Sequence, residues 1–197
     1  MTDVLPPEGL DLLFRKARTH NGWQDAPVSD DLLLKVVELA STGPTAFNQQ
    51  PIRVIFVRSD EEKARLAPAL SRGNLEKTMA APAVAILCYD LDFWKHLDAA
   101  APGFDAASMF DGNRAAALES AQRNGSLQAG YFILAARALG LDTGPMSGFD
   151  KQKVADAFLT DHPSWEVNML VNLGHGNAEA LRPQRPRHAP EFTASIV

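Results

Sequence analysis

Two basic clusters stand out in a chain whose formal net charge is −5. One lies near the start of the sequence and the other near its end: Arg15, Lys16 and Arg18, then Arg182, Arg185 and Arg187. Either cluster alone is typical of a solvated surface. Guanidinium groups match the oxygens of a phosphate, however, so two cationic clusters in an acidic chain could meet at one small phosphate.

A second candidate group is the pair Asn74 and Lys77, which a helix would place on one face at a spacing of i, i+3. A side-chain amide both accepts and donates hydrogen bonds, and an ammonium group supplies positive charge. The pair can therefore address neighbouring polar atoms of one ring. Without Asn74, Lys77 would be interpreted as an exposed lysine on a helix face.

Several reaction classes lack their residue patterns. No Gly-x-Gly-x-x-Gly follows a strand, because the run Gly174–Gly176 continues to Glu179, and no Walker loop is present. Ser147 is out of register for the Gly-x-Ser-x-Gly turn of serine hydrolases. The five histidines have neither metal-ligand spacing nor a cysteine partner, so we predict no metal site.

Composition and charge limit the compartment and the partners. The negative net charge argues against nucleic acid and membrane surfaces as general partners. No apolar run is long enough to span a bilayer, and the beginning of the chain lacks the apolar centre of a signal peptide. The single cysteine, Cys88, lies in an apolar run and is expected to be a buried, inert thiol. We therefore expect a cytoplasmic protein.

Helical patterns predict the elements that must position these residues. Apolar residues recur at helical spacing in 10–17 and in 33–40. Ser29, which is followed by two acidic residues, predicts the start of the second of these helices, and Gly43-Pro44 predicts its end. Ser59 opens a further helix with the spacing of a capping box.

A long helical region is predicted from Asn113 to Leu139, broken or bent near Asn124-Gly125. Its second half, 127–139, is apolar on every face, so it must be covered all round. A subunit interface and a central position within one monomer both meet that requirement, and the pattern alone leaves the choice open.

Three strands are predicted, at 52–57, 83–89 and 167–173. Residues 91–112 form an irregular excursion without a sustained period, and a Pro-rich basic arm occupies 178–197. Few strand-helix-strand units can be counted. The expected fold is therefore an α+β sandwich, with a mixed, mostly antiparallel sheet flanked by helices, in a single domain of residues 1–197.

Five pieces of sequence occur in an order that resembles the nitroreductase superfamily. They are Arg18-Thr19 with 27–30 (PVSD), 43–51 (GPTAFNQQP), Asn74-x-x-Lys77, 144–149 (GPMSGF) and Arg185-Pro186-Arg187. Four stretches are similar to its malonic semialdehyde reductase branch: 20–23 (HNGW), 73–79 (GNLEKTM), 123–129 (RNGSLQA) and 140–150 (GLDTGPMSGFD). The resemblance spans nearly the whole chain. It implies an enzyme that depends on flavin mononucleotide (FMN), oxidises NAD(P)H and works as a homodimer around its long apolar helix, with FMN at the subunit interface.

The resemblance also implies which residues bind FMN. Those for the phosphate and its surroundings are Arg18, Thr19, His20, Arg185 and Arg187; those for the ring are Asn74, Lys77, Ser147 and Gly148; those for the ring or ribityl chain are Thr45, Ala46 and Asn48. Some of them would serve the cofactor of the partner chain.

In this scheme Lys77 stabilises the anionic reduced ring and raises its reduction potential, while the N–H of Gly148 bonds to flavin N5. The chain departs from the superfamily at three positions. Ala17 and Asn21 occupy the first and last positions of the usual Arg-x-Ser-x-Arg pattern, and Ser147 stands where glutamate is common. Fewer cations than usual are therefore expected at the phosphate.

The implied reaction is reduction of malonic semialdehyde (3-oxopropanoate) to 3-hydroxypropanoate in pyrimidine degradation, by ping-pong hydride transfer through flavin N5. Two alternatives stay open: a nitroaromatic or quinone reductase of the same fold, and a non-catalytic flavin-binding dimer. The sequence identifies no catalytic acid and does not separate NADH from NADPH as the reductant.

Overall fold

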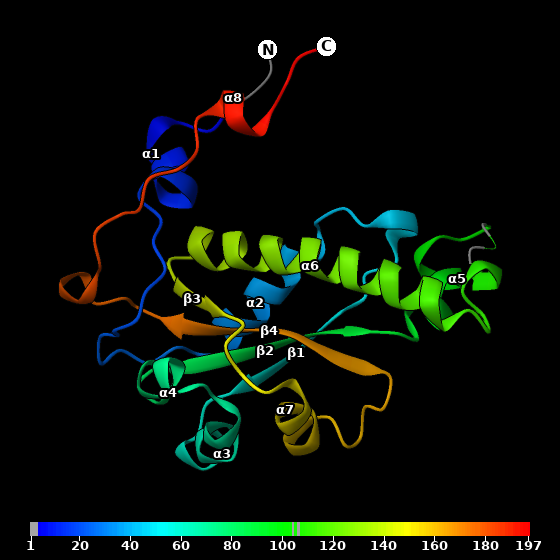
Figure 1. Ribbon diagram of the computed structural model, residues 1–197, viewed down its shortest axis with the longest axis horizontal. Coiled ribbons are helices and arrows are strands. Elements are labelled where there is room, and N and C mark those ends of the chain that lie inside the picture. The colour runs from blue at the N-terminus through cyan, green and yellow to red at the C-terminus, as the bar shows by residue number, and fades with distance from the viewer. Residues whose placement is uncertain (1–3, 104, 106) are drawn as a thin grey trace.

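The central sheet has four antiparallel strands in the computed structural model, which describes residues 4–103, 105 and 107–197 (Figure 1). They are β1 (Ile52–Val57), β2 (Ala83–Asp90), β3 (Asp142–Met146) and β4 (Trp165–Gly174). Their order across the sheet is β1-β2-β4-β3. The strand pairs are all antiparallel, in agreement with the expected α+β fold and its mostly antiparallel sheet, and one isolated parallel bridge joins Thr19, outside the named strands, to Thr143.

Strand β3 is the strand that the sequence analysis did not predict. Residues 142–146 (DTGPM) lack the apolar alternation of a strand and contain Gly144 and Pro145. β3 lies at the edge of the sheet beside β4, and an edge strand tolerates proline because its outward N–H groups need no ladder partner. The bounds of the other three strands differ from the predicted ones by two residues at most.

Helices cover both faces of the sheet (Figure 1). On one face lie α2 (Asp30–Ser41) and α6 (Arg114–Ala138), and on the other lie α3 (Asp60–Leu66) and α7 (Lys151–Phe158). Ala83 and Ala85 of β2 pack in the core beneath α2 and α6, whereas Val84 and Ile86 pack in the core beneath α3 and α7. Successive β2 residues therefore point to opposite faces, which explains why the whole strand is apolar.

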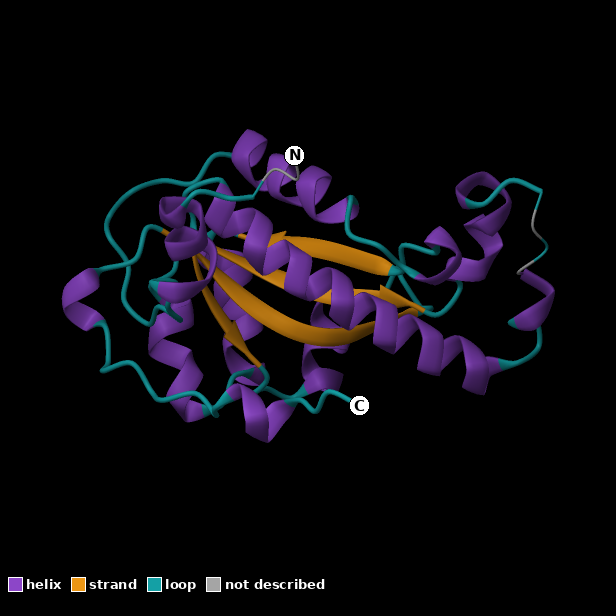
Figure 2. Ribbon diagram, turned by 90° about the horizontal axis from the view of Figure 1, so that it is seen from above, coloured by secondary structure: helices purple, strands orange, loops and turns teal. Residues whose placement is uncertain are grey.

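Helix α6 runs without interruption from Arg114 to Ala138 and crosses the sheet (Figure 2). The break expected near Asn124-Gly125 is wrong, because both residues serve packing. The buried Asn124 amide donates to the carbonyl of Ser120 at 2.9 Å, and its oxygen accepts from the N–H of Ala46 at 2.9 Å. Gly125 lets the helix approach Tyr89, since an added Cβ would lie 2.8 Å from the Tyr89 Cβ.

The predicted helix starts are confirmed by side-chain hydrogen bonds. The hydroxyl of Ser29 accepts from the N–H of Leu32, and the hydroxyl of Ser59 accepts from the N–H of Glu62, both at 3.2 Å. Each serine thus satisfies an N–H group that the first helical turn leaves free.

Shorter elements complete the described chain. The remaining α-helices are α1 (Pro7–Leu10), α4 (Arg72–Met79), α5 (Leu97–Ala100) and α8 (Pro190–Thr193). A π-helical turn follows α1 at Asp11–Arg15, where a helix was predicted, and 3-10 turns lie at Ala46–Asn48, Ala67–Ala69, Phe93–His96, Ala107–Met109 and Ala178–Ala180. Two residues of the excursion expected at 91–112, residues 104 and 106, lie outside the described part. None of the described helices is long and apolar enough to cross a membrane.

Candidate functional site

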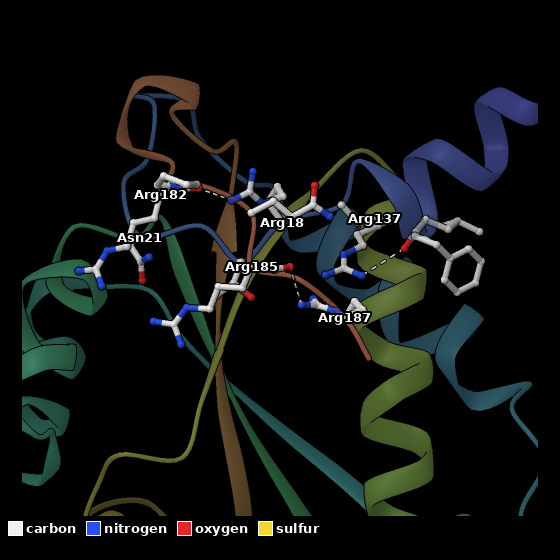
Figure 3. A pocket seen from close by; sticks show the side chains of 12 residues that line it. Arg18, Asn21, Arg137, Arg182, Arg185 and Arg187 are labelled. Carbon is white, nitrogen blue, oxygen red and sulfur yellow. Dashed lines mark hydrogen bonds between the residues drawn. The ribbon is translucent and has the colours of Figure 1, made fainter. Parts of the chain in front are cut away.

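The two basic clusters do meet, at a cavity of about 520 Å³. Figure 3 shows arginines from the segment after α1, from α6 and from the C-terminal arm around this hollow. The cationic lining residues are Arg18, Arg137, Arg182, Arg185 and Arg187, and Thr19, Ala17 and Asn21 also line it. We call it the basic cavity. The other two cations of the first cluster do not line it; Arg15 and Lys16 instead form ion pairs with Asp11.

Hydrogen bonds between distant parts of the sequence fix the two walls of the basic cavity. The N–H of His20 donates to the carbonyl of Thr143 at 3.0 Å, which fastens the first wall to the edge strand β3. The guanidinium of Arg18 donates to the carbonyl of Arg182, which fastens the C-terminal arm to that wall. The backbone therefore brings together residues that lie far apart in the sequence.

The His20 side chain lies behind this wall and does not line the cavity. It is buried, its Nε2 lies 3.3 Å from an Asp142 carboxylate oxygen, and its ring occupies the space beside Gly176. A Cβ on Gly176 would lie 1.9 Å from the imidazole Nδ1. Asp142 also accepts from the N–H of Gly176 at 2.8 Å. The side chain of His20, predicted to bind FMN, therefore packs against Asp142 and Gly176 instead of facing the basic cavity.

Arg137 and Arg182 line the cavity although neither was among the predicted FMN-binding residues, and Arg182 was named only as a member of the second basic cluster. Arg137 lies in the last turn of α6 and donates to the carbonyl of Leu13 at 3.2 Å. Burial lowers the pKa of the Arg137 guanidinium, and nearby Asp142 opposes that shift. Together the two arginines supply positive charges that compensate for the two arginines of the superfamily pattern replaced by Ala17 and Asn21. The sequence could have indicated Arg137, because it is a single cation in the last turn of a helix whose second half is apolar.

A second cavity, of about 680 Å³, adjoins the first and shares Asn21 and Arg182 with it. We call it the α4 cavity, because most of its other lining residues come from that helix: Arg72, Gly73, Glu76 and Lys77, with Ala80 at the helix C-cap. Burial lowers the pKa of Lys77, and the positive charge of Arg182 lowers it further. The carbonyl of Lys77 accepts from the indole N–H of Trp23 at 3.0 Å, which anchors the helix.

Asn74 and Gly148 are in direct contact. The Asn74 amide donates to the carbonyl of Gly148 at 2.8 Å, and the N–H of Ser71 donates to the same oxygen at 3.0 Å. An added Cβ at position 148 would lie 2.7 Å from the Asn74 amide nitrogen, so this approach requires glycine. Among the described residues the N–H of Gly148 has no hydrogen-bond partner, and the adjoining Ser147 side chain is exposed.

Thr45, Ala46 and Asn48 lie elsewhere on the molecule, and none of them lines either cavity. Their loop is fastened to the middle of α6 by the Ala46–Asn124 bond and towards α5 by the Asn48 amide, which donates to the carbonyl of Ala100 at 2.9 Å. Arg137, which lines the basic cavity, is about 20 Å from Asn124 along α6 at roughly 1.5 Å per residue.

The residues around the two cavities fit an FMN. Five guanidinium groups at one hollow suit a phosphate dianion, since each offers paired N–H donors. Lys77 supplies a cation, and Gly148 leaves an N–H free beside the Asn74 amide. These groups would hold the phosphate at the basic cavity and the ring near α4. A bound flavin would supply two-electron hydride chemistry there.

Comparisons with known proteins agree with this fit. The profile described as Nitroreductase family matches residues 15–175. A Stenotrophomonas maltophilia (strain R551-3) protein, provisionally named NADH dehydrogenase/NAD(P)H nitroreductase, is 53% identical over 197 residues, 100% of both chains. A provisionally assigned nitroreductase of Exiguobacterium sibiricum 255-15, solved in complex with FMN, shares the fold with a TM-score of 0.83 at 22% identity, over 100% of both chains. A provisionally assigned nitroreductase of Bacillus subtilis gives 0.83 at 24% identity, over 94% of this chain and 97% of its own.

Proposed function

The chain belongs to the nitroreductase family and is an FMN-dependent NAD(P)H oxidoreductase, and we propose that it reduces malonic semialdehyde (3-oxopropanoate) to 3-hydroxypropanoate. One observation carries the choice of acceptor: stretches that resemble the malonic semialdehyde reductase branch come together at the α4 cavity. Asn21 and Gly22 line it from one stretch, and Gly73 and Lys77 line it from another. A third stretch joins them where Gly148 contacts Asn74.

The overall reaction is balanced by one hydride and one proton. NAD(P)H gives a hydride that ends as a new C–H bond on the aldehyde carbon, and the carbonyl oxygen takes a proton to become the alcohol. The arginines of the basic cavity would hold the cofactor phosphate, and Lys77 would supply positive charge to the ring. A cytoplasmic role in pyrimidine degradation agrees with this reaction and with the free, buried thiol of Cys88.

We further infer a homodimer with FMN between the subunits. Leu127 and Tyr131 on α6 are 45% and 38% exposed in a single chain, and Leu134, one turn further along that stripe, is half-buried. A second subunit would cover this apolar stripe, because burial of apolar surface is favourable at roughly 25 cal/mol per Å². The same partner could bring its Thr45, Ala46 and Asn48 to a cavity that this chain's own loop does not line.

A nitroaromatic or quinone reductase is the second candidate, and the name of the relative that is 53% identical favours it. Steady-state kinetics on the FMN-loaded protein compares malonic semialdehyde with a nitroaromatic and a quinone. We expect the highest kcat/KM for malonic semialdehyde. A higher kcat/KM for either other acceptor would favour the second candidate.

A third possibility is a flavin-binding dimer without turnover. Mixing the loaded protein with NADH or NADPH in the absence of oxygen tests it through the flavin absorbance. We expect rapid bleaching, which would also identify the preferred nicotinamide. An absorbance that stays unchanged with both would make the protein a carrier.

A further inference from the structure

Arg72 is a cation at the α4 cavity, and it has no role in the FMN binding described above. It lies in the first turn of α4 and is exposed. Within the described residues its guanidinium has no ion pair or hydrogen bond. Glu76, four residues further along and lining the same cavity, forms no ion pair with it. An unpaired arginine at a cavity wall is available to a ligand.

The charge balance of the α4 cavity favours an anionic ligand. Its lining contains three cations, Arg72, Lys77 and Arg182, against the single acid Glu76. The Arg182 charge lowers the pKa of Lys77, so repulsion between these cations is not neutralised within the chain. Arg182 is one of the five arginines of the basic cavity, which would serve the FMN phosphate, and Lys77 would serve the ring. Arg72 is therefore the cation of the α4 cavity that remains for a further anion.

We propose that Arg72 binds the carboxylate of the acceptor, so that the α4 cavity selects short anionic aldehydes over neutral ones. This inference rests on the proposed function and names the group that recognises its substrate. A guanidinium matches a carboxylate with two parallel N–H donors. Beside it Gly73 leaves open space, since an added Cβ there would meet nothing within 4 Å.

The other anion that such an enzyme meets is the 2′-phosphate of NADPH, and the position of Arg72 disfavours it. That phosphate is on the adenosine ribose, at the opposite end of the coenzyme from the nicotinamide. Arg72 shares its cavity and helix with Lys77, the predicted ring cation. A three-carbon acid can have its aldehyde at the ring and its carboxylate close by, as this cavity requires.

The test compares 3-oxopropanoate with propanal, an aldehyde of the same length that lacks the carboxylate. The ratio of their kcat/KM values is measured for FMN-loaded wild type, Arg72→Ala, Arg72→Lys and Lys151→Ala. Lys151 is an exposed lysine on α7 outside both cavities, and its removal changes the net charge by the same amount. Isothermal titration calorimetry with 3-hydroxypropanoate provides a readout of binding without turnover, and FMN titration checks that loading is unaffected.

We expect Arg72→Ala to lower the ratio on the order of tenfold, the effect of losing one charged hydrogen-bonding partner, and to weaken 3-hydroxypropanoate binding in parallel. Arg72→Lys should keep part of both, and Lys151→Ala should resemble wild type. Equal losses for both aldehydes, or an unchanged ratio, would overturn the inference. So would a loss that appears only in the KM for NADPH, because Arg72 would then serve the coenzyme.

Failure of the proposed function gives a different pattern. Wild type would then reduce a nitroaromatic but not 3-oxopropanoate. Arg72-dependent binding of 3-hydroxypropanoate in the calorimeter would still support a carboxylate site, whereas absence of that binding would overturn the site as well.

Discussion

The C-terminal end and the middle of α6 carry different parts of the predicted FMN site. At the C-terminal end, Arg137 joins arginines from both ends of the chain around the basic cavity. Towards the middle, Asn124 holds the loop that contains Thr45, Ala46 and Asn48, and the basic cavity does not extend to this loop. The first part is assembled within one chain. The loop of the second part is also held in place, but it lines neither cavity of its own chain.

The loop at 45–48 is firmly held within this chain, although it lines neither cavity. The loop is fixed by three hydrogen-bonding side chains, Asn124, Asn48 and Gln49, the last of which donates to the Ser120 hydroxyl at 3.1 Å. Phe47 and Asn48 have φ angles of 53° and 52°, a left-handed conformation that is costly for such residues. We infer that this loop contacts the cofactor of the partner subunit.

The largest expected effect comes from breaking the link between the two regions. We predict that Leu127→Asp gives a monomer whose FMN affinity is lower on the order of a hundredfold or more, because an unpaired charge would be buried in the interface. Light scattering across a dilution series and FMN fluorescence titration measure the two effects.

Thr160→Asp, in the exposed turn after α7, is the control for adding a charge and should leave both properties unchanged. A stable Leu127→Asp monomer that binds one FMN as tightly as wild type would show that one chain contains the whole site.

The contrast between the two regions also explains what the sequence could and could not predict. Caps such as Ser29 and strands such as 83–89 depend on neighbouring residues, so local patterns were sufficient for them. β3 was missed because Gly144 and Pro145 hide an edge strand whose pairing is with distant β4. Arg137 was missed because its role depends on a cavity formed by residues from three separate segments.

The resemblance supplied the loop at 45–48 and the ring residues Asn74, Lys77 and Gly148. The fold brings Asn74 to Gly148 but leaves the loop away from both cavities. The helix break expected at Asn124-Gly125 failed for a related reason. An asparagine and a glycine weaken an isolated helix, but here tertiary contacts to Ala46 and Tyr89 decide the outcome. Local propensity was overridden wherever a residue served a partner far away in the sequence.

A second prediction sharpens the description of the basic cavity. Arg137→Ala should weaken FMN binding by about tenfold, the effect of one charged hydrogen-bond partner, if this arginine compensates for Ala17 and Asn21. FMN titration by flavin fluorescence measures it. The matched control is Arg114→Ala at the other end of α6, which removes an exposed ion pair with Glu166 and should leave FMN affinity unchanged. Equal FMN affinities for Arg137→Ala and wild type would show that only the arginines near the two ends of the chain bind the phosphate.

A third prediction concerns the ring rather than the phosphate. Lys77→Ala should lower the two-electron reduction potential of bound FMN by about 30 mV, which corresponds to a tenfold change in the reduction equilibrium. The physical reason is that the lost cation stabilises the anionic reduced ring. Potentials are measured by equilibration with reference dyes, and FMN affinity should fall by a smaller factor. An unchanged potential would return Lys77 to the role of a surface lysine.

The smallest expected effect tests whether the two cavities are joined electrostatically. Burial and the Arg182 charge both lower the pKa of Lys77, so its reactive neutral amine should form at a lower pH than in an ordinary lysine. In the apo-protein, the rate of Lys77 acetylation can be followed against pH by peptide mass spectrometry. Arg182→Ala should move the midpoint upward, because a repelling charge is removed. The return to an ordinary lysine value should be incomplete, since burial is the larger cause and remains. Arg182→Lys keeps the charge, so its midpoint should stay close to that of wild type. An unchanged midpoint in Arg182→Ala would show that the charge of Arg182 does not act on Lys77.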